Sequence, residues 1–277
     1  MTQTNYYSGQ HRFSVWLVRL AAGLVLFFLL LPILIVIPLS FNAEPFFTFT
    51  EGMLRLDPNA YSLQWYKAIA DSAKWKLAVQ NSFLIGLCAT FIATTLGTLA
   101  AVGLASATMP WRRAITALLL SPMIVPLIIV AAGMFFFSTR FNLVASFWGI
   151  VIAHAALGVP FVIITVTATL SQFDQTLYRA GLSMGASPFK VFCTIIVPLI
   201  RPGVISGALF AFGISFDEVI VVLFLAGPDQ ITIPRQMFSG LREQINPTIL
   251  AVATLLIVFS VALLATLEVL RRRMPKA

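Results

Sequence analysis

The sequence predicts an all-α integral membrane protein with six transmembrane helices, on two observations. Hydrophobic residues make up 59% of the 277 residues and charged residues 10%, with a mean hydropathy of +0.95. A soluble protein has about 45–50% apolar and about 25% charged residues. The apolar residues also gather into six stretches that each exceed the about 20 residues needed to cross a bilayer. These stretches, within a single transmembrane domain over 1–277, are residues 15–39, 83–107, 115–137, 144–170, 203–226 and 247–270.

The distribution of charge predicts how the spans are oriented. The formal net charge is +8, and eleven of the 18 basic residues fall on the cytoplasmic side if the N-terminus lies there. Loops on the other side carry basic and acidic residues in near balance. This bias predicts that both termini are cytoplasmic. Orientation and anionic lipid account for the basic pI, so no nucleic-acid partner is expected.

The first loop, residues 40–82, follows the first span on the outer side. It contains Tyr61, Trp65 and Tyr66. Tyr and Trp are enriched at the membrane–water interface. We therefore expect an interfacial helix here rather than a substrate contact.

Prolines interrupt several of the predicted spans. Pro32 and Pro38 lie in the first, Pro122 and Pro126 in the third and Pro160 in the fourth. A proline removes a helical hydrogen bond, and neighbouring helices must then satisfy the freed group. These positions predict kinks.

The loop 171–202 is too long for a turn and too polar for a span. Residues 178–184 can form a short helix, and Gly185-Ala186-Ser187-Pro188 then supplies a turn, a capping side chain and a first helical position. The apolar run 191–200 predicts a second short helix that lies at the membrane surface. A helix–turn–helix on the cytoplasmic side is expected.

The same stretch resembles a known signature. It reads Arg179-Ala180-Gly181-Leu182-Ser183-Met184-Gly185-Ala186-Ser187 and, farther on, Phe189 and Val197-Pro198. It is similar to the cytoplasmic signature loop of ABC-type importer permeases, with Arg179 where the family commonly has Glu and Gly181 where it has a second Ala. In that family the loop inserts a short helix into a cleft of a separate ATPase. The resemblance implies ATPase-coupling roles for Arg179, Ala180, Gly181, Gly185, Ala186, Ser187, Phe189 and Pro198.

The likeness extends over almost the whole chain. Ser40-Phe41-Asn42, Ala153-His154, Pro160-Phe161, Ser215-Phe216-Asp217-Glu218-Val219 and Gly227-Pro228 resemble the second permease of spermidine/putrescine importers. The resemblance implies location in the bacterial inner membrane. Its implied partners are membrane lipid, a second homologous permease, a periplasmic substrate-binding protein and an ATPase dimer that uses ATP and Mg. It implies no cofactor bound by this chain.

Asp217-Glu218 is the main candidate for substrate recognition. The pair falls in the middle of the fifth predicted span, where a charged side chain costs about 2.5–3.5 kcal/mol. Either a carboxylate attracts the ammonium groups of a polyamine, or the pair is buried against the partner permease. Asp217 is favoured for the first role and Glu218 for the second.

Three other intramembrane residues are candidates for the substrate pathway. His154 is either a hydrogen-bonded packing residue or a ligand, and Trp148 and Phe161 can line a path for an alkyl chain. The chain has no Gly-x-x-x-x-Gly-Lys-Ser/Thr phosphate loop and only two His. We therefore expect no catalytic residue, no metal site and no ATP hydrolysis by this chain.

Three alternatives remain open. The chain could be a permease for another small organic solute, such as 4-aminobutyrate or an amino acid derivative. A self-contained secondary transporter would show internal repeats and discontinuous helices, and no convincing repeat is visible. A membrane-embedded enzyme needs a catalytic constellation that is missing from the sequence.

Overall fold

The computed structural model describes residues 9–106, 109–171, 175–243 and 247–273. Within these ranges the protein is helical, and one isolated bridge between Asn42 and Tyr61 is the only β pairing. Five described helices are long and apolar enough to cross a membrane, and a sixth is added if one sharply bent pair counts as a single span. The predicted all-α membrane fold is confirmed. Residue 107, residues 172–174 of the predicted coupling loop and the extreme termini lie outside the described residues.

Contacts divide the chain into two compact units. One unit comprises Met1–Asp71 and Gln244–Thr266, and the other comprises Ser72–Glu243 and Leu267–Ala277. The organisation as one domain over 1–277 therefore stays a prediction.

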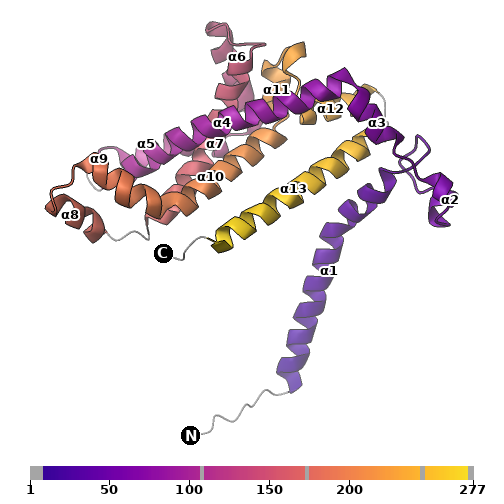
Figure 1. The fold of residues 1–277 in the computed structure, drawn as a ribbon, viewed down its shortest axis with the longest axis horizontal. Coiled ribbons are helices and arrows are strands. Elements are labelled where there is room, and N and C mark those ends of the chain that lie inside the picture. Colours follow the sequence, from indigo (N-terminus) through magenta and orange to yellow (C-terminus); the bar gives the residue numbers. More distant parts are fainter. Residues whose placement is uncertain (1–8, 107–108, 172–174, 244–246, 274–277) are drawn as a thin grey trace. The chain divides into compact units, whose positions relative to one another are not determined.

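The first unit holds a long apolar helix followed by a tightly bonded loop. Trp65 Nε1 donates a hydrogen bond to the carbonyl of Asn42 at 2.7 Å, and the hydroxyls of Ser40 and Tyr66 lie 2.6 Å apart. These bonds tie the aromatic segment to the end of the first helix. The elements, labelled in Figure 1, are α1 (Gly9–Leu39), α2 (Glu51–Leu54), the 3₁₀ turn Pro58–Ala60, α3 (Gln64–Asp71) and most of α13 (Thr248–Arg273).

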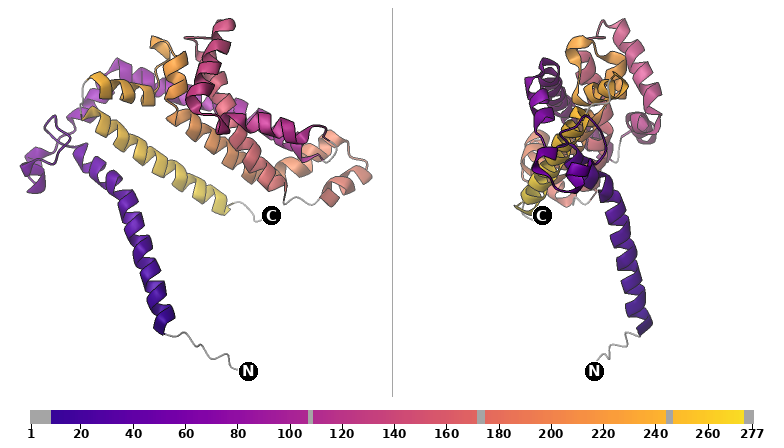
Figure 2. Two further views of the ribbon diagram at one scale, coloured as in Figure 1. Left: turned by 180° about the vertical axis from the view of Figure 1, so that it is seen from behind. Right: turned by 90° about the vertical axis from the view of Figure 1, so that its right-hand side faces the viewer.

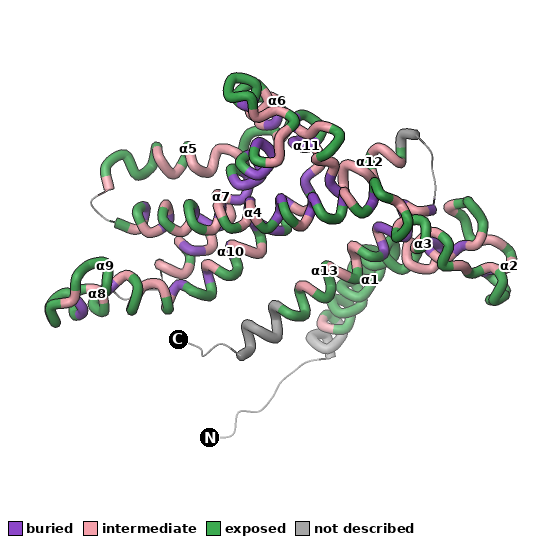
Figure 3. Tube along the Cα trace, turned by 45° about the horizontal axis from the view of Figure 1, so that its top comes forward, coloured by how far each residue is buried: buried purple, intermediate pink, exposed green. Residues whose placement is uncertain are grey.

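The second unit is built on three helices that run alongside one another: α4 (Ala73–Ala105), α7 (Phe147–Leu170) and α10 (Val197–Asp217). Figure 2 shows them side by side from two further directions, in purple, pink and orange. Buried residues concentrate on α7 and on the faces of α4 and α10 that meet it (Figure 3).

Small residues bring these three helices close together. A Cβ on Gly97 of α4 would lie 2.6 Å from Cβ of Val162 on α7, and a Cβ on Gly158 would lie 3.0 Å from that of Ala211 on α10. Lipid is as apolar as the helix surfaces, so the hydrophobic effect does not drive these helices together. Van der Waals packing at small residues stabilises their association instead. The core is therefore a seam of backbone-to-backbone contact.

Helix α4 begins ten residues before the predicted start of the second span. The hydroxyl of Ser72 accepts a hydrogen bond from the backbone N–H of Trp75 and caps the helix. Asn81 and Ser82 then lie inside the helix although they are polar, because loop groups of the same unit bond to them. The helix therefore starts before residue 83, where the predicted span begins.

The third predicted span is two helices. Helix α5 (Arg112–Ile124) and helix α6 (Leu127–Arg140) meet at an angle of 106°. Pro126 forces the preceding residue out of the helical region, and Val125 is extended with φ −73° and ψ 137°. The sequence predicts a kink here, but not a turn past a right angle.

The fifth predicted span is displaced and interrupted. Its helix starts at Pro188, runs through α9 (Pro188–Val191), the π turn Phe192–Ile196 and α10, and ends at Asp217. The separate surface helix predicted at 191–200 is the first part of this helix. The π turn, in which the N–H of Val197 donates to the carbonyl of Phe192, precedes Pro198, which has no N–H to give. A non-helical step at Glu218 and Val219 then separates α10 from α11 (Ile220–Leu225).

Candidate functional site: an exposed turn and an interrupted helix

The turn predicted at Gly185 is present between α8 (Gln175–Ser183) and α9. Gly185 has φ +82°, in the left-handed region that favours glycine. Its N–H donates to the carbonyl of Leu182 at 2.9 Å, and the N–H of Ala186 donates to the carbonyl of Gly181 at 3.2 Å. This pair of bonds is a Schellman motif, which satisfies the last carbonyl groups of α8.

Ser187 starts the next helix at once. Its hydroxyl accepts a hydrogen bond from the backbone N–H of Lys190 at 3.3 Å, and Pro188 occupies the first helical position. Two apolar side chains flank the turn and point away from the unit, since Met184 is 80% exposed and Phe189 is 76% exposed. The result is a capped turn with an exposed apolar side chain on each side.

The unusual Gly181 lies where the two helices of this hairpin cross. It is buried, and a Cβ there would lie 3.0 Å from Val191 Cγ2 and 3.1 Å from Ile195 Cδ1. Glycine therefore lets α8 pack closely on α9 and the π turn. Of the other residues assigned to coupling, Ala186 is half-buried, and the exposed ones are Arg179, Ala180, Ser187, Phe189 and Pro198.

The acidic pair lies at the opposite end of α10, and the structure separates its two members. Asp217 is the last residue of α10 and is exposed, whereas Glu218 is 7% exposed. Glu218 Oε1 accepts a hydrogen bond of 2.9 Å from the backbone N–H of Val221 in the first turn of α11. The pair does not stand in the middle of one continuous helix, because this carboxylate bonds to the backbone where the helix is broken.

Arg235 holds the other end of α11. It comes from α12 (Ile233–Glu243), and its guanidinium donates to the carbonyls of Ala226 at 2.9 Å and of Gly227 at 3.4 Å. Desolvation lowers the pKa of this guanidinium from its ordinary value. An acid at the start of a helix and a base at its end both complement the helix dipole. Arg235 was not among the predicted site residues, and its one signal in the sequence is a basic residue shortly after Gly227-Pro228.

Side chains of α4 anchor the loop between α11 and α12. The amide of Asn81 donates to the carbonyls of Asp229 at 2.8 Å and Ile231 at 3.0 Å, and the hydroxyl of Ser82 accepts from the N–H of Ile233. These bonds, with Arg235, fix the segment that follows the break.

The remaining pathway candidates lie apart on α7. His154 is 1% exposed, and its Nδ1 lies 2.8 Å from the hydroxyl of Ser215 on α10, two residues before Asp217. Trp148 is 57% exposed and packs edge-on against Phe147, while Phe161 is half-buried with its ring stacked on Phe210. His154 thus lies near the end of α10 that carries the acids, while Trp148 and Phe161 pack against other aromatic rings.

No group of three or more His, Cys, Asp or Glu residues suited to a metal ion occurs among the described residues. The site consists of an exposed turn, a long helix, and carboxylates at the far end of that helix. Together with the long apolar helices, these features are typical of a polytopic membrane transport protein.

Comparison with known proteins agrees with this class. The sequence model of the family "Binding-protein-dependent transport system inner membrane component" matches residues 93–276, and the chain belongs to that family. It is accordingly an inner-membrane permease subunit of an ABC importer and not an enzyme, and the self-contained transporter is excluded although its discontinuous helices are present.

Individual relatives and a solved structure cover most of the chain. The spermidine/putrescine transport system permease protein PotC of Haemophilus influenzae is 29% identical over 89% of this chain and 93% of its own. The putrescine transport system permease protein PotI of Escherichia coli K12 is 30% identical over 83% of this chain and 82% of its own. A chain of a bacterial ABC transporter involved in the import of the acidic polysaccharide alginate has the same fold, with a TM-score of 0.73 over 98% of this chain and 100% of its own at 14% identity.

Proposed function

We propose that this chain is one of two permease subunits of an ATP-driven importer that carries a polyamine such as putrescine or spermidine. Two of its relatives are named for these substrates, and both are matched over more than four fifths of this chain. Asp217 supplies an exposed carboxylate of the kind that an ammonium group binds. A second permease and a periplasmic binding protein complete the pathway.

The exposed turn at Gly185 is the observation that carries the mechanism. We assign it as the contact with a separate ATPase, which binds ATP and Mg. The α8–α9 hairpin presents the exposed apolar side chains of Met184 and Phe189, so it can fill an apolar cleft. From Pro188 the same helix continues to Asp217, so displacement of the turn reaches the acidic end without an intervening loop.

Uptake by the complete complex tests the substrate. Membranes containing all subunits should accumulate labelled putrescine or spermidine when ATP is supplied, and 4-aminobutyrate much less. If 4-aminobutyrate is taken up faster than putrescine and spermidine, the substrate belongs to the alternative class of small organic solutes.

A substitution at the turn tests the coupling. Gly185→Val forces a branched side chain into the left-handed region, which costs about 1–3 kcal/mol locally. Uptake should be lost or the ATPase released, while the chain still inserts into the membrane. Gly23→Val is a matched control, because a Cβ added to Gly23 of α1 would meet no atom within 4 Å and the backbone there is not left-handed. Normal coupling in the Gly185 variant would refute this role.

Labelling with an impermeant thiol reagent tests the orientation, in a background without Cys88 and Cys193. A cysteine at the exposed position Asn59 should react from outside, and one at Lys276 should not. The reverse pattern would place both termini outside the cytoplasm.

A further inference from the structure

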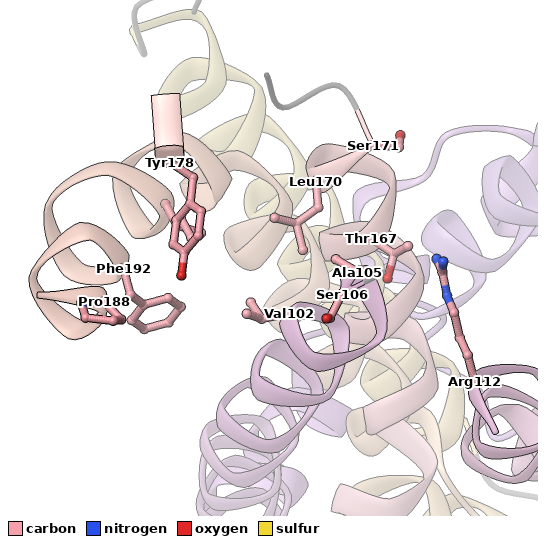
Figure 4. Close-up of a pocket in the computed structure, with 11 residues that line it drawn as sticks. Val102, Ala105, Ser106, Arg112, Thr167, Leu170, Ser171, Tyr178, Pro188 and Phe192 are labelled. Carbon is pink, nitrogen blue, oxygen red and sulfur yellow. The ribbon is translucent and has the colours of Figure 1, made fainter. Parts of the chain in front are cut away.

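A cavity of about 580 Å³ lies beside the hairpin, at the end of the second unit opposite the acidic pair. Four segments line it: the end of α4, the start of α5, the end of α7 and the α8–α9 hairpin with its π turn (Figure 4). None of the residues assigned to ATPase coupling or to substrate binding lines this cavity, so neither role explains it.

The lining of this cavity is amphiphilic. One wall is apolar and consists of Val102, Leu170, Phe192 and Ile196. Among the described residues that line it, Arg112 carries a charge and none is acidic. Because a polyamine would be repelled by this guanidinium, the cavity does not belong to the proposed substrate path.

Arg112 shares the lining of the cavity with other polar side chains. In Figure 4 its guanidinium extends toward the side of the cavity where Thr167 lies, while the phenol of Tyr178 projects in from the hairpin. The hydroxyl of Thr167 is buried and has no hydrogen-bond partner among the described residues. A guanidinium and an unpaired buried hydroxyl together suit an anionic oxygen.

The start of α5 adds two further signs. Its first turn carries Arg112 and Arg113 and no acid, although a cation is unfavourable at that end of a helix. Both arginines line a second, adjoining cavity. The residue before them, Trp111, is 82% exposed, as expected of an aromatic side chain at the level of lipid headgroups.

We propose that the cavity binds one anionic phospholipid, with its phosphate against Arg112 and an acyl chain along the apolar wall. A free phosphate would leave that wall uncovered, whereas a lipid satisfies both parts. Basic pockets between membrane helices are suited to anionic headgroups. The bound lipid joins the α8–α9 hairpin to the ends of α4 and α7, and so braces the turn that we assign to coupling.

Native mass spectrometry of the purified, delipidated complex tests the site directly. The complex is incubated with phosphatidylglycerol or with phosphatidylcholine of the same acyl chains. One phosphatidylglycerol per copy of this chain should persist, and phosphatidylcholine should not. Arg112→Gln should weaken retention about fivefold, since a basic side chain near an anionic membrane surface contributes about 1 kcal/mol.

Two further variants separate charge from space. Arg140→Gln removes a basic residue that does not line the cavity and should leave retention unchanged. Ala105→Phe should lower retention by filling the cavity even though Arg112 remains. Equal retention of the two lipids, unchanged retention in Arg112→Gln, or displacement by millimolar inorganic phosphate would each overturn the proposal. Because the readout is bound lipid, its failure is distinct from a failure of the uptake or coupling experiments.

Discussion

The two interrupted spans of the second unit are broken by different physical causes. Between α5 and α6 the chain turns by 106° at Pro126, which lacks an N–H and restricts Val125. Between α10 and α11 there is no proline at the break. There the buried carboxylate of Glu218 bonds to the N–H of Val221 instead.

The first break starts from a local restriction at Pro126 and is then supported by packing of α6 against α11, whereas the second depends on tertiary partners from the start. Pro126 acts on its own neighbours, whereas the short α11 keeps its place because Glu218 holds its start and Arg235 of α12 its end. The two second halves also pack together, and the N–H of Ala145 after α6 donates to the carbonyl of Leu225 at 2.8 Å. The helix that follows each break therefore packs against the helix that follows the other.

Glu218→Leu should cause the largest loss of stability. It leaves the N–H of Val221 buried without an acceptor, which costs about 1–3 kcal/mol. The melting temperature of the purified complex should fall clearly, and less chain should accumulate in the membrane. A melting temperature equal to that of the wild type would show that the carboxylate does not maintain the break.

Arg235→Met should have the next largest effect. Three carbonyl groups at and beyond the end of α11 lose the hydrogen bond from the guanidinium, and those of Val222 and Gly227 keep a backbone donor. Hydrogen bonds to a charged group contribute about 1.5–3 kcal/mol, but regained packing by Met offsets part of the loss. Thermal unfolding measures the change, and Arg235→Lys should fall between the variant and the wild type. If the Lys variant melts at a lower temperature than the Met variant, the hydrogen bonds of the guanidinium do not explain the stabilisation, because a half-buried charge is then unfavourable at this position.

Pro126→Ala should change stability by less than about 1 kcal/mol, in the range of substitutions that leave native contacts intact. The bend should persist because α6 packs against α11. Spin labels at the exposed positions Leu118 and Phe136 can report it, since their separation increases if the two helices straighten. A longer separation in the Ala variant would mean that proline alone maintains the bend.

Asp217→Asn should have the smallest effect on stability, within about 0.5 kcal/mol, because Asp217 is exposed. Polyamine uptake should nevertheless fall while complex assembly and basal ATP hydrolysis persist. If assembly fails instead, the carboxylate pairs with a basic residue of the partner permease, whose charge is then left unpaired. Unchanged uptake together with unchanged assembly would remove Asp217 from the pathway.

Several features were determined by the sequence alone, because each depends on residues that are close in the chain. Apolar length predicted the membrane class, and Gly-Ala-Ser-Pro predicted the turn at Gly185, the cap by Ser187 and the first helical position of Pro188. Proline positions predicted kinks in the first, third and fourth spans, and the third span is bent between α5 and α6 at Pro126.

Other features were decided only by the tertiary structure. Asn81 is helical and buried because a loop almost 150 residues away accepts its hydrogen bonds. The role of Glu218 depends on the helix end that α12 completes through Arg235, and the spacing of α4, α7 and α10 depends on which glycines face one another. Hydropathy measures transfer from water to lipid, so it locates apolar segments but carries no information about which polar group meets which backbone across the bundle.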